Sequence, residues 1–174
     1  MKRIIEQWGA LVAEVCRASS VPPEFLLALI ANESGGDASA ERFEPRVFER
    51  FKQIAAGNHP AWGAVTAQLL AGLGDDALRV LATSYGLTQV MGYNAAFRHV
   101  DPLALRDPRT CLQLTTRMLA EDAARFGLDL KTDFAEMFAT WNSGNPRGHA
   151  VPGYIASGLA HLAEAQSLLG VKHA

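Results

Sequence analysis

Cysteine is scarce in this chain of 174 residues. Only two occur, Cys16 and Cys111, and each lies in a stretch whose apolar spacing predicts an amphipathic helix. Two distant thiols form neither a disulfide framework nor a metal-ligand cluster, so we expect both to be free and buried. The five histidines are His59, His99, His149, His161 and His173. They are scattered without ligand spacing, which argues against a metal site. No sequence pattern indicates a cofactor.

The chain also has little net charge and no long apolar run. Lys and Arg number 16 against 18 Asp and Glu, a formal net charge of -2 that gives no general attraction to nucleic acid. No run approaches the length of a membrane span. The start Met1-Lys2-Arg3 is similar to that of a signal peptide, but Glu6 and Glu14 interrupt any apolar segment behind it. We therefore expect synthesis in the cytoplasm without a signal peptide, so that action elsewhere needs separate release or delivery.

What the sequence does contain is typical of one globular domain. Hydrophobic residues make up 49% and charged residues 20%, which is not the composition of a disordered chain. Ala and Leu outnumber Val, Ile and Thr, a bias toward helix formers. We expect a mainly α, monomeric protein with a single domain over residues 1–174.

Apolar periodicity and terminal signals place the expected helices. The first covers about 4–15, and the second begins at Pro23 and ends at Ser34-Gly35-Gly36. A loop from Gly36 leads into a short helix after Pro45, and residues 84–92 form a compact segment. The remaining expected helices cover 58–74, 75–82 with Asp75 as its N-cap, 108–126, 133–142 and 154–169.

Glu33 is the first candidate for chemistry. It follows Leu29 by four residues and Ile30 by three, so a helix places its carboxyl on the apolar side. Burial and the C-terminal end of the helix would both raise its pKa, as a general acid near neutral pH requires. The alternative is an exposed glutamate at a frayed helix end beside a Gly-Gly turn.

Four segments in order resemble the soluble lytic transglycosylases, relatives of goose-type lysozyme. Residues 28–36 (ALIANESGG) are similar to the family's ESGG catalytic motif, and residues 42–45 (RFEP) to its RYEP element. Residues 82–92 (ATSYGLTQVMG) resemble SxGLMQVM, and residues 139–144 (ATWNSG) resemble AYNAG, with Tyr154 where the family places a late tyrosine. The resemblance covers about 21–158. Thr88, Trp141 and Ser143 depart from the family pattern, which affects the expected sugar contacts more than the reaction class.

This resemblance implies a lysozyme-like helical fold with a groove for the glycan strand of peptidoglycan. Glu33 would protonate the oxygen that joins N-acetylmuramic acid to N-acetylglucosamine. The same carboxylate would then take a proton from the 6-hydroxyl, which closes a 1,6-anhydro ring instead of admitting water. This differs from glycosidases with two catalytic carboxylates. It further implies that the protein acts on the cell wall after release or delivery.

The resemblance also suggests substrate-binding residues, each with a structural alternative. Gln89 and Met91 would line the sugar sites, and Ser84 would hydrogen-bond Glu33 or substrate. Asn142 would hold a backbone turn or an N-acetyl group. Tyr154 would orient the Glu33 carboxyl or contact the muramoyl ring, or would only pack in the core.

Glu44 leaves the reaction type open. As a second acid it could activate water and make the protein a hydrolytic muramidase, or it could pair with Arg42 or Arg46 and fix the loop, which the flanking arginines favour. A third hypothesis is a catalytically silent peptidoglycan-binding or structural module.

Overall fold

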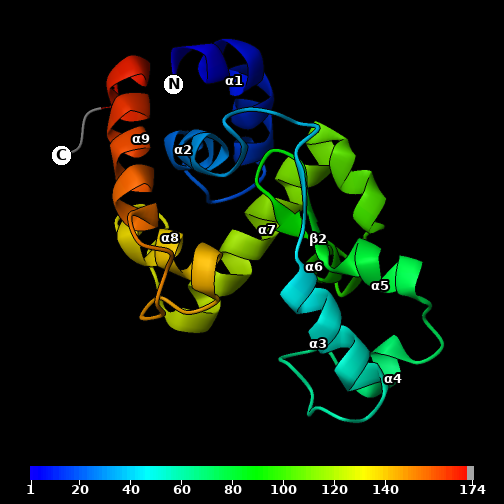
Figure 1. Ribbon diagram of the computed structural model, residues 1–174. Coiled ribbons are helices and arrows are strands. Elements are labelled where there is room, and N and C mark those ends of the chain that lie inside the picture. Colours follow the sequence, from blue (N-terminus) through cyan, green and yellow to red (C-terminus); the bar gives the residue numbers. More distant parts are fainter. Residues whose placement is uncertain (172–174) are drawn as a thin grey trace. The chain divides into compact units, whose positions relative to one another are not determined.

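The computed structural model describes residues 1–171 and is mainly helical, with 61% helix and one small three-stranded sheet (Figure 1). This confirms the mainly α prediction. The chain divides into two compact units, residues 1–37 with 112–174 and residues 38–111. The single domain over 1–174 stays a prediction. In the described part of the chain, none of the helices has both the length and the apolar character needed to cross a membrane.

The first unit is built around a buried helix. Its elements are α1 (Lys2–Arg17), α2 (Pro23–Ser34), most of α7 (Pro108–Phe126), α8 (Phe134–Ser143) and α9 (Tyr154–Leu169). Helix α2 packs against both α1 and α9 (Figure 1). Its apolar run from Phe25 to Ile30 is at most 1% exposed. A helix that is apolar nearly all round has neighbours on several sides, as its sequence predicts.

Aromatic rings fill the space between α2, α8 and α9. The Phe25 ring on α2 lies 4.7 Å from the Phe138 ring and 5.7 Å from the Phe134 ring, both on α8. Gly158 makes room for Phe138 against α9, because a Cβ at that position would lie 2.7 Å from the Phe138 ring. These contacts fix α8 against the helix that precedes the Gly35-Gly36 turn.

The second unit combines short helices with the sheet. Its elements are β1 (Glu41–Phe43), α3 (Pro45–Ala55), α4 (Ala67–Leu70), α5 (Asp75–Leu81), β2 (Thr83–Tyr85), β3 (Val90–Met91), α6 (Gly92–Ala96) and the 3-10 helix η1 (Pro102–Arg106). The strands are antiparallel in the order β1-β2-β3, and Ser84 in the central strand pairs with Arg42 on one side and Met91 on the other.

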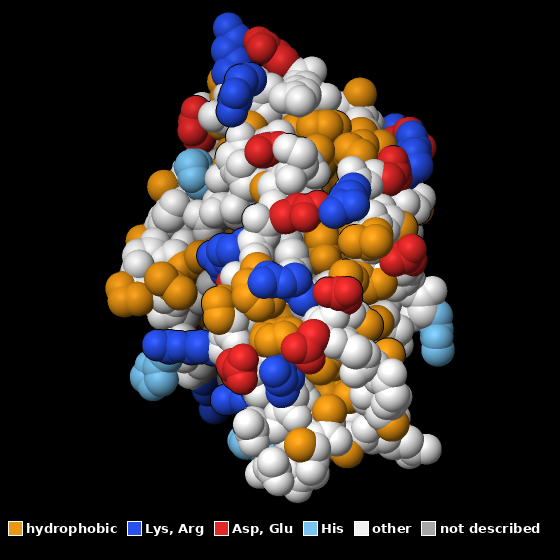
Figure 2. Space-filling model, turned by 45° about the vertical axis from the view of Figure 1, so that its right-hand side comes forward, with side chains coloured by type: hydrophobic (Ala, Val, Ile, Leu, Met, Phe, Trp, Pro, Cys, Tyr) orange, Lys and Arg blue, Asp and Glu red, His pale blue; other side chains and the backbone are white. Residues whose placement is uncertain are grey.

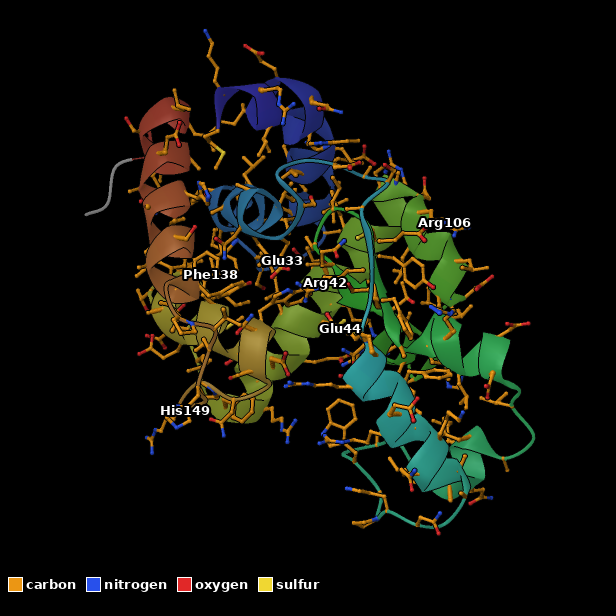
Figure 3. The ribbon with its side chains drawn as sticks, in the orientation of Figure 1. Glu33, Arg42, Glu44, Arg106, Phe138 and His149 are labelled. Atoms are coloured by element: carbon orange, nitrogen blue, oxygen red, sulfur yellow. The ribbon has the colours of Figure 1, made fainter. Side chains whose placement is uncertain are left out.

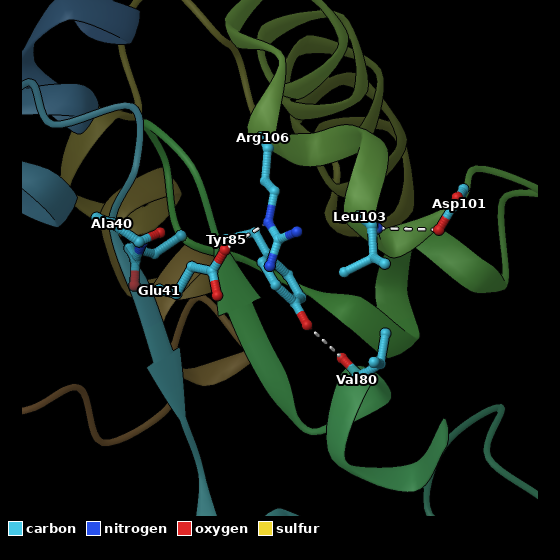
Figure 4. A network of polar contacts seen from close by, with 8 residues as sticks. Ala40, Glu41, Val80, Tyr85, Asp101, Leu103 and Arg106 are labelled. Carbon is cyan, nitrogen blue, oxygen red and sulfur yellow. Dashed lines mark hydrogen bonds and ion pairs between the residues drawn. The ribbon is translucent and has the colours of Figure 1, made fainter. Parts of the chain in front are cut away.

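Polar contacts join the sheet to the helices of this unit. Arg106 of η1 forms an ion pair with Glu41 of β1 at 2.6 Å (Figure 4). In the same view the Tyr85 hydroxyl donates to the carbonyl oxygen of Val80 at 3.2 Å. Acidic and basic side chains are intermixed on the face drawn in Figure 2, in keeping with the balanced composition.

Two expectations for the second unit were wrong, and short elements were missed. Of the helix expected over 58–74, only Ala67–Leu70 forms, and Trp62 pairs with Val65 in an isolated bridge. Gly63 and Gly72 adopt positive φ within this range, which interrupts a helix. Asp75 is the first residue of α5, and Gly74 is its N-cap. The missed elements are β1, β2, β3, α6 and η1.

Candidate functional site

Glu33 lies in the last turn of α2, immediately before the helix ends at Ser34 (Figure 3). Gly35 follows with φ of 62° and Gly36 with φ of 90°, so the chain leaves the helix through a left-handed turn that favours glycine. The Glu33 side chain is half-buried. Its Oε1 accepts a hydrogen bond from the Tyr154 hydroxyl of α9. The glutamate therefore has a defined environment and is not an exposed residue at a frayed end.

Tyr154 is held so that its hydroxyl stays protonated. Burial raises the pKa of the Tyr154 phenol above its usual value, and the nearby Glu33 charge and the hydrogen bond to it raise this pKa further. The phenol ring makes an edge contact with Phe138, with centroids 6.4 Å apart. Asn32 Nδ2 donates to the Tyr154 carbonyl oxygen at 3.3 Å. A neutral phenol at this position can donate a proton to the hydrogen bond throughout the neutral pH range.

Asn142 shapes the loop that leads to Tyr154. Its Oδ1 accepts from the Val151 backbone N–H at 2.9 Å, and the Tyr154 N–H donates to the Val151 carbonyl oxygen at 2.9 Å. The loop begins at Gly144, which ends α8 with φ of 75°. Of the two roles expected for Asn142, these bonds match the holding of a backbone turn.

The β2–β3 hairpin brings Ser84, Gln89 and Met91 together. The Ser84 hydroxyl donates to Gln89 Oε1 at 2.9 Å. Gln89 Nε2 donates to the Ala40 carbonyl oxygen at 2.9 Å and to the Gly86 carbonyl oxygen at 3.0 Å. Gln89 has φ of 52°, a backbone conformation that costs free energy in a residue with a Cβ, and its side-chain bonds offset that cost. The amide therefore stabilises the turn. Met91 is half-buried opposite Ser84.

Glu44 marks the start of α3 and pairs with an arginine. Its backbone carbonyl oxygen accepts from the N–H groups of Val47 and Phe48, and its carboxylate lies 2.6 Å from Arg42 Nε (Figure 3). Of the expected roles, this contact matches the pairing that fixes the loop, with Arg42 as the partner. The water-activating role of Glu44 stays a hypothesis.

The predicted site residues fall into two sets. Glu33, Asn142 and Tyr154 lie in the first unit, where the structure joins them through α2, α8 and α9. The set in the second unit consists of Glu44, Ser84, Gln89 and Met91. Sequence reasoning missed Asn32 and Phe138 as neighbours of Tyr154. Asn32 stands next to Glu33 in the sequence, whereas the pattern around Phe138 indicates only a core residue.

The second unit also contains an apolar hollow of about 420 Å³. Tyr93 is its one titratable lining residue, and the rest of the wall is made of aliphatic side chains and proline, including Leu69, Leu73 and Pro102. A wall of this kind supplies no acid or base at neutral pH. Elsewhere in residues 1–171, His, Cys, Asp and Glu side chains form no group of three or more that could hold a metal ion.

Comparison of the chain with protein-family models, with curated proteins and with solved structures finds no match. In this site Glu33 and Tyr154 supply a half-buried carboxyl at a helix end with a protonated phenol bonded to it. Such a pair can transfer a proton to and from a bound substrate.

Proposed function

We propose that this protein is a peptidoglycan lytic transglycosylase with a lysozyme-like fold. The observation that carries the proposal is the hydrogen bond from the Tyr154 hydroxyl to the Glu33 carboxylate. The motif resemblance names these two residues from segments 121 positions apart, and both are found in one site. The mainly helical architecture is compatible with the same proposal.

One carboxyl group performs both proton transfers in the proposed reaction. The Glu33 carboxyl gives its proton to the oxygen between N-acetylmuramic acid and N-acetylglucosamine as the bond from that oxygen to C1 breaks. The resulting carboxylate takes the proton of the muramoyl 6-hydroxyl while O6 forms the new bond to C1. The products are a 1,6-anhydro end and a free 4-hydroxyl. No water is consumed, and Glu33 regains its proton.

Tyr154 acts on Glu33 and not on the sugar in this proposal. The hydrogen bond from Tyr154 stabilises the carboxylate that Glu33 becomes after it has given up its proton. It also limits rotation of the side chain, which keeps the acid aligned for proton transfer. The peptidoglycan strand is the proposed partner, reached after release or delivery to the cell wall.

Mass spectrometry of products released from purified peptidoglycan tests the proposal. The wild type should release muropeptides that are lighter by one water than hydrolysis products, and Glu33→Gln should release none because the amide cannot donate the proton. Glu136→Gln, at an exposed position of α8, is the matched control and should retain activity.

Each other outcome contradicts the proposal in a distinct way. Full activity of Glu33→Gln would exclude Glu33 as the acid. Products with reducing ends would indicate a hydrolytic muramidase and direct attention to Glu44. Binding of glycan strands without any product from the wild type would indicate a silent peptidoglycan-binding module.

A further inference from the structure

The turn after Glu33 is held from outside by helix α1. Trp8 Nε1 donates to the Gly36 carbonyl oxygen at 2.9 Å, and Arg3 Nη2 donates to the Gly35 carbonyl oxygen at 3.0 Å. Gly36 is buried and packs closely against α1. A Cβ at this position would lie only 3.1 Å from Ile4 Cγ1. Two side chains of one helix thus bind two successive carbonyl groups of one turn.

This turn needs such support more than an ordinary helix end does. Two consecutive glycines at positive φ lose more conformational entropy on folding than other residues. Within the turn, the Gly36 N–H donates to Ser34 Oγ at 3.2 Å and the Asp37 N–H to the Ser34 carbonyl oxygen at 3.2 Å. These local bonds are near the long end of the usual range. The contacts from α1 therefore add substantially to the order of the turn.

Order in the turn is transmitted to Glu33. The last turn of a helix lacks part of its backbone hydrogen bonding and frays when the following residues are free. Glu33 lies in that last turn, two residues before Gly35, and its carboxyl must stay within hydrogen-bond reach of Tyr154. Displacement of a catalytic group by about 1 Å is enough to lose much of its activity.

We propose that Trp8 is a positioning residue for Glu33, acting through its hydrogen bond to Gly36, with Arg3 as a weaker second support. This rests on the proposed function for its effect on activity. The restraint on the turn itself does not depend on any activity.

Trp8→Phe tests the proposal because it keeps an aromatic ring and removes the indole N–H. We expect kcat for muropeptide release to fall about fivefold with KM unchanged. A factor of this size corresponds to the net free energy of one typical hydrogen bond. Hydrogen exchange at the Gly36 and Asp37 amides should speed up by a similar factor, while exchange in residues 26–31 of α2 stays the same. Arg3→Met, at an exposed position, should show smaller changes in the same direction.

Trp62→Phe is the matched control, since Trp62 packs on Phe51 and Tyr93 in the second unit. It should leave exchange at Gly36 and Asp37 unchanged. If Trp8 only stabilised the fold, turnover by Trp8→Phe would fall only as far as the fraction of unfolded protein rose. That result would overturn the proposal. Unchanged exchange and unchanged kcat in Trp8→Phe would overturn it as well.

The two proposals fail separately. Suppose that the wild type released no muropeptides while Trp8→Phe still accelerated exchange at Gly36 and Asp37. The restraint of the turn by Trp8 would then be supported and the transglycosylase assignment would be wrong. If the wild type were active and exchange in Trp8→Phe were unchanged, the assignment would stand and the positioning role would fall.

Discussion

At the residue scale, the Glu33 carboxyl and the Tyr154 phenol depend on each other. Burial raises the pKa of the phenol, the carboxylate raises it further, and the protonated phenol gives the carboxylate a directed hydrogen bond. A hydrogen bond to a charged group contributes about 1.5–3 kcal/mol. Removal of one oxygen atom from Tyr154 should therefore be measurable in stability and, if the proposed function holds, in the rate of the proposed reaction.

Tyr154→Phe removes that oxygen and keeps the ring against Phe138. We expect muropeptide release to fall about tenfold to a hundredfold and the free energy of unfolding to fall by about 1.5–3 kcal/mol. Rates on purified peptidoglycan and urea unfolding measure the two effects. Tyr85→Phe, which loses a hydrogen bond to Val80 in the second unit, should reduce stability alone. Equal activity in the two variants would show that the Tyr154 hydroxyl has no part in the reaction.

Individual residues differ in how far the sequence predicts their contacts. The position of Glu33 on the apolar side of a helix follows from helical spacing. The bonds of Gln89 do not, because a long amide can reach several backbone groups. It binds one carbonyl in the hairpin, Gly86, and one before β1, Ala40. Asn142 had two possible roles, and only the structure supplies its contact with Val151.

At the scale of elements, the long helices were predictable and the short ones were not. Helices α1, α7, α8 and α9 show apolar periods, and α2 is a continuous apolar run between a proline and two glycines. Gly144 and Gly170 end α8 and α9 as expected. Strands of two or three residues are too short to show a period. Their pairing depends on contacts between distant segments, which local spacing does not contain.

Replacement of two helical glycines by alanine should have opposite effects on the free energy of unfolding. Gly9→Ala should raise the free energy of unfolding by about 1 kcal/mol, because alanine favours helix and its Cβ meets Ile5 at an ordinary 3.4 Å. Gly158→Ala should lower it by about 1–3 kcal/mol, because its Cβ would lie 2.7 Å from the Phe138 ring. Urea unfolding of both variants measures the difference. A stabilising Gly158→Ala would mean that α8 and α9 adjust freely.

At the scale of the whole molecule, several buried groups favour the protonated state. Burial raises the pKa of the Cys16 thiol to about 12, and it also raises the pKa values of Tyr85, Tyr93 and Tyr154. The unfolded chain releases these protons at lower pH than the folded protein does. The contribution to stability is therefore complete below about pH 9 and is lost as the pH rises toward 12.

We expect the urea midpoint to be constant from pH 7 to 8.5 and to fall steadily from pH 9 to 11. Cys16→Ala should make the fall less steep, because one of the groups that titrates only on unfolding is removed. Glu136→Gln leaves these groups intact and should follow the wild-type curve. A flat profile to pH 11 would show that the thiol and phenols titrate alike in the folded and unfolded states.

The Tyr154–Glu33 contact spans 121 positions of the chain, with the second unit encoded between its two partners. Contacts of such long sequence separation form slowly, because a large loop must close before they stabilise the fold. A ribosome that has finished α2 must still make α3 through α8 before Tyr154 emerges. The Glu33 carboxyl is therefore synthesised long before its partner, so that a nascent or truncated chain carries Glu33 without the Tyr154 hydroxyl that binds it.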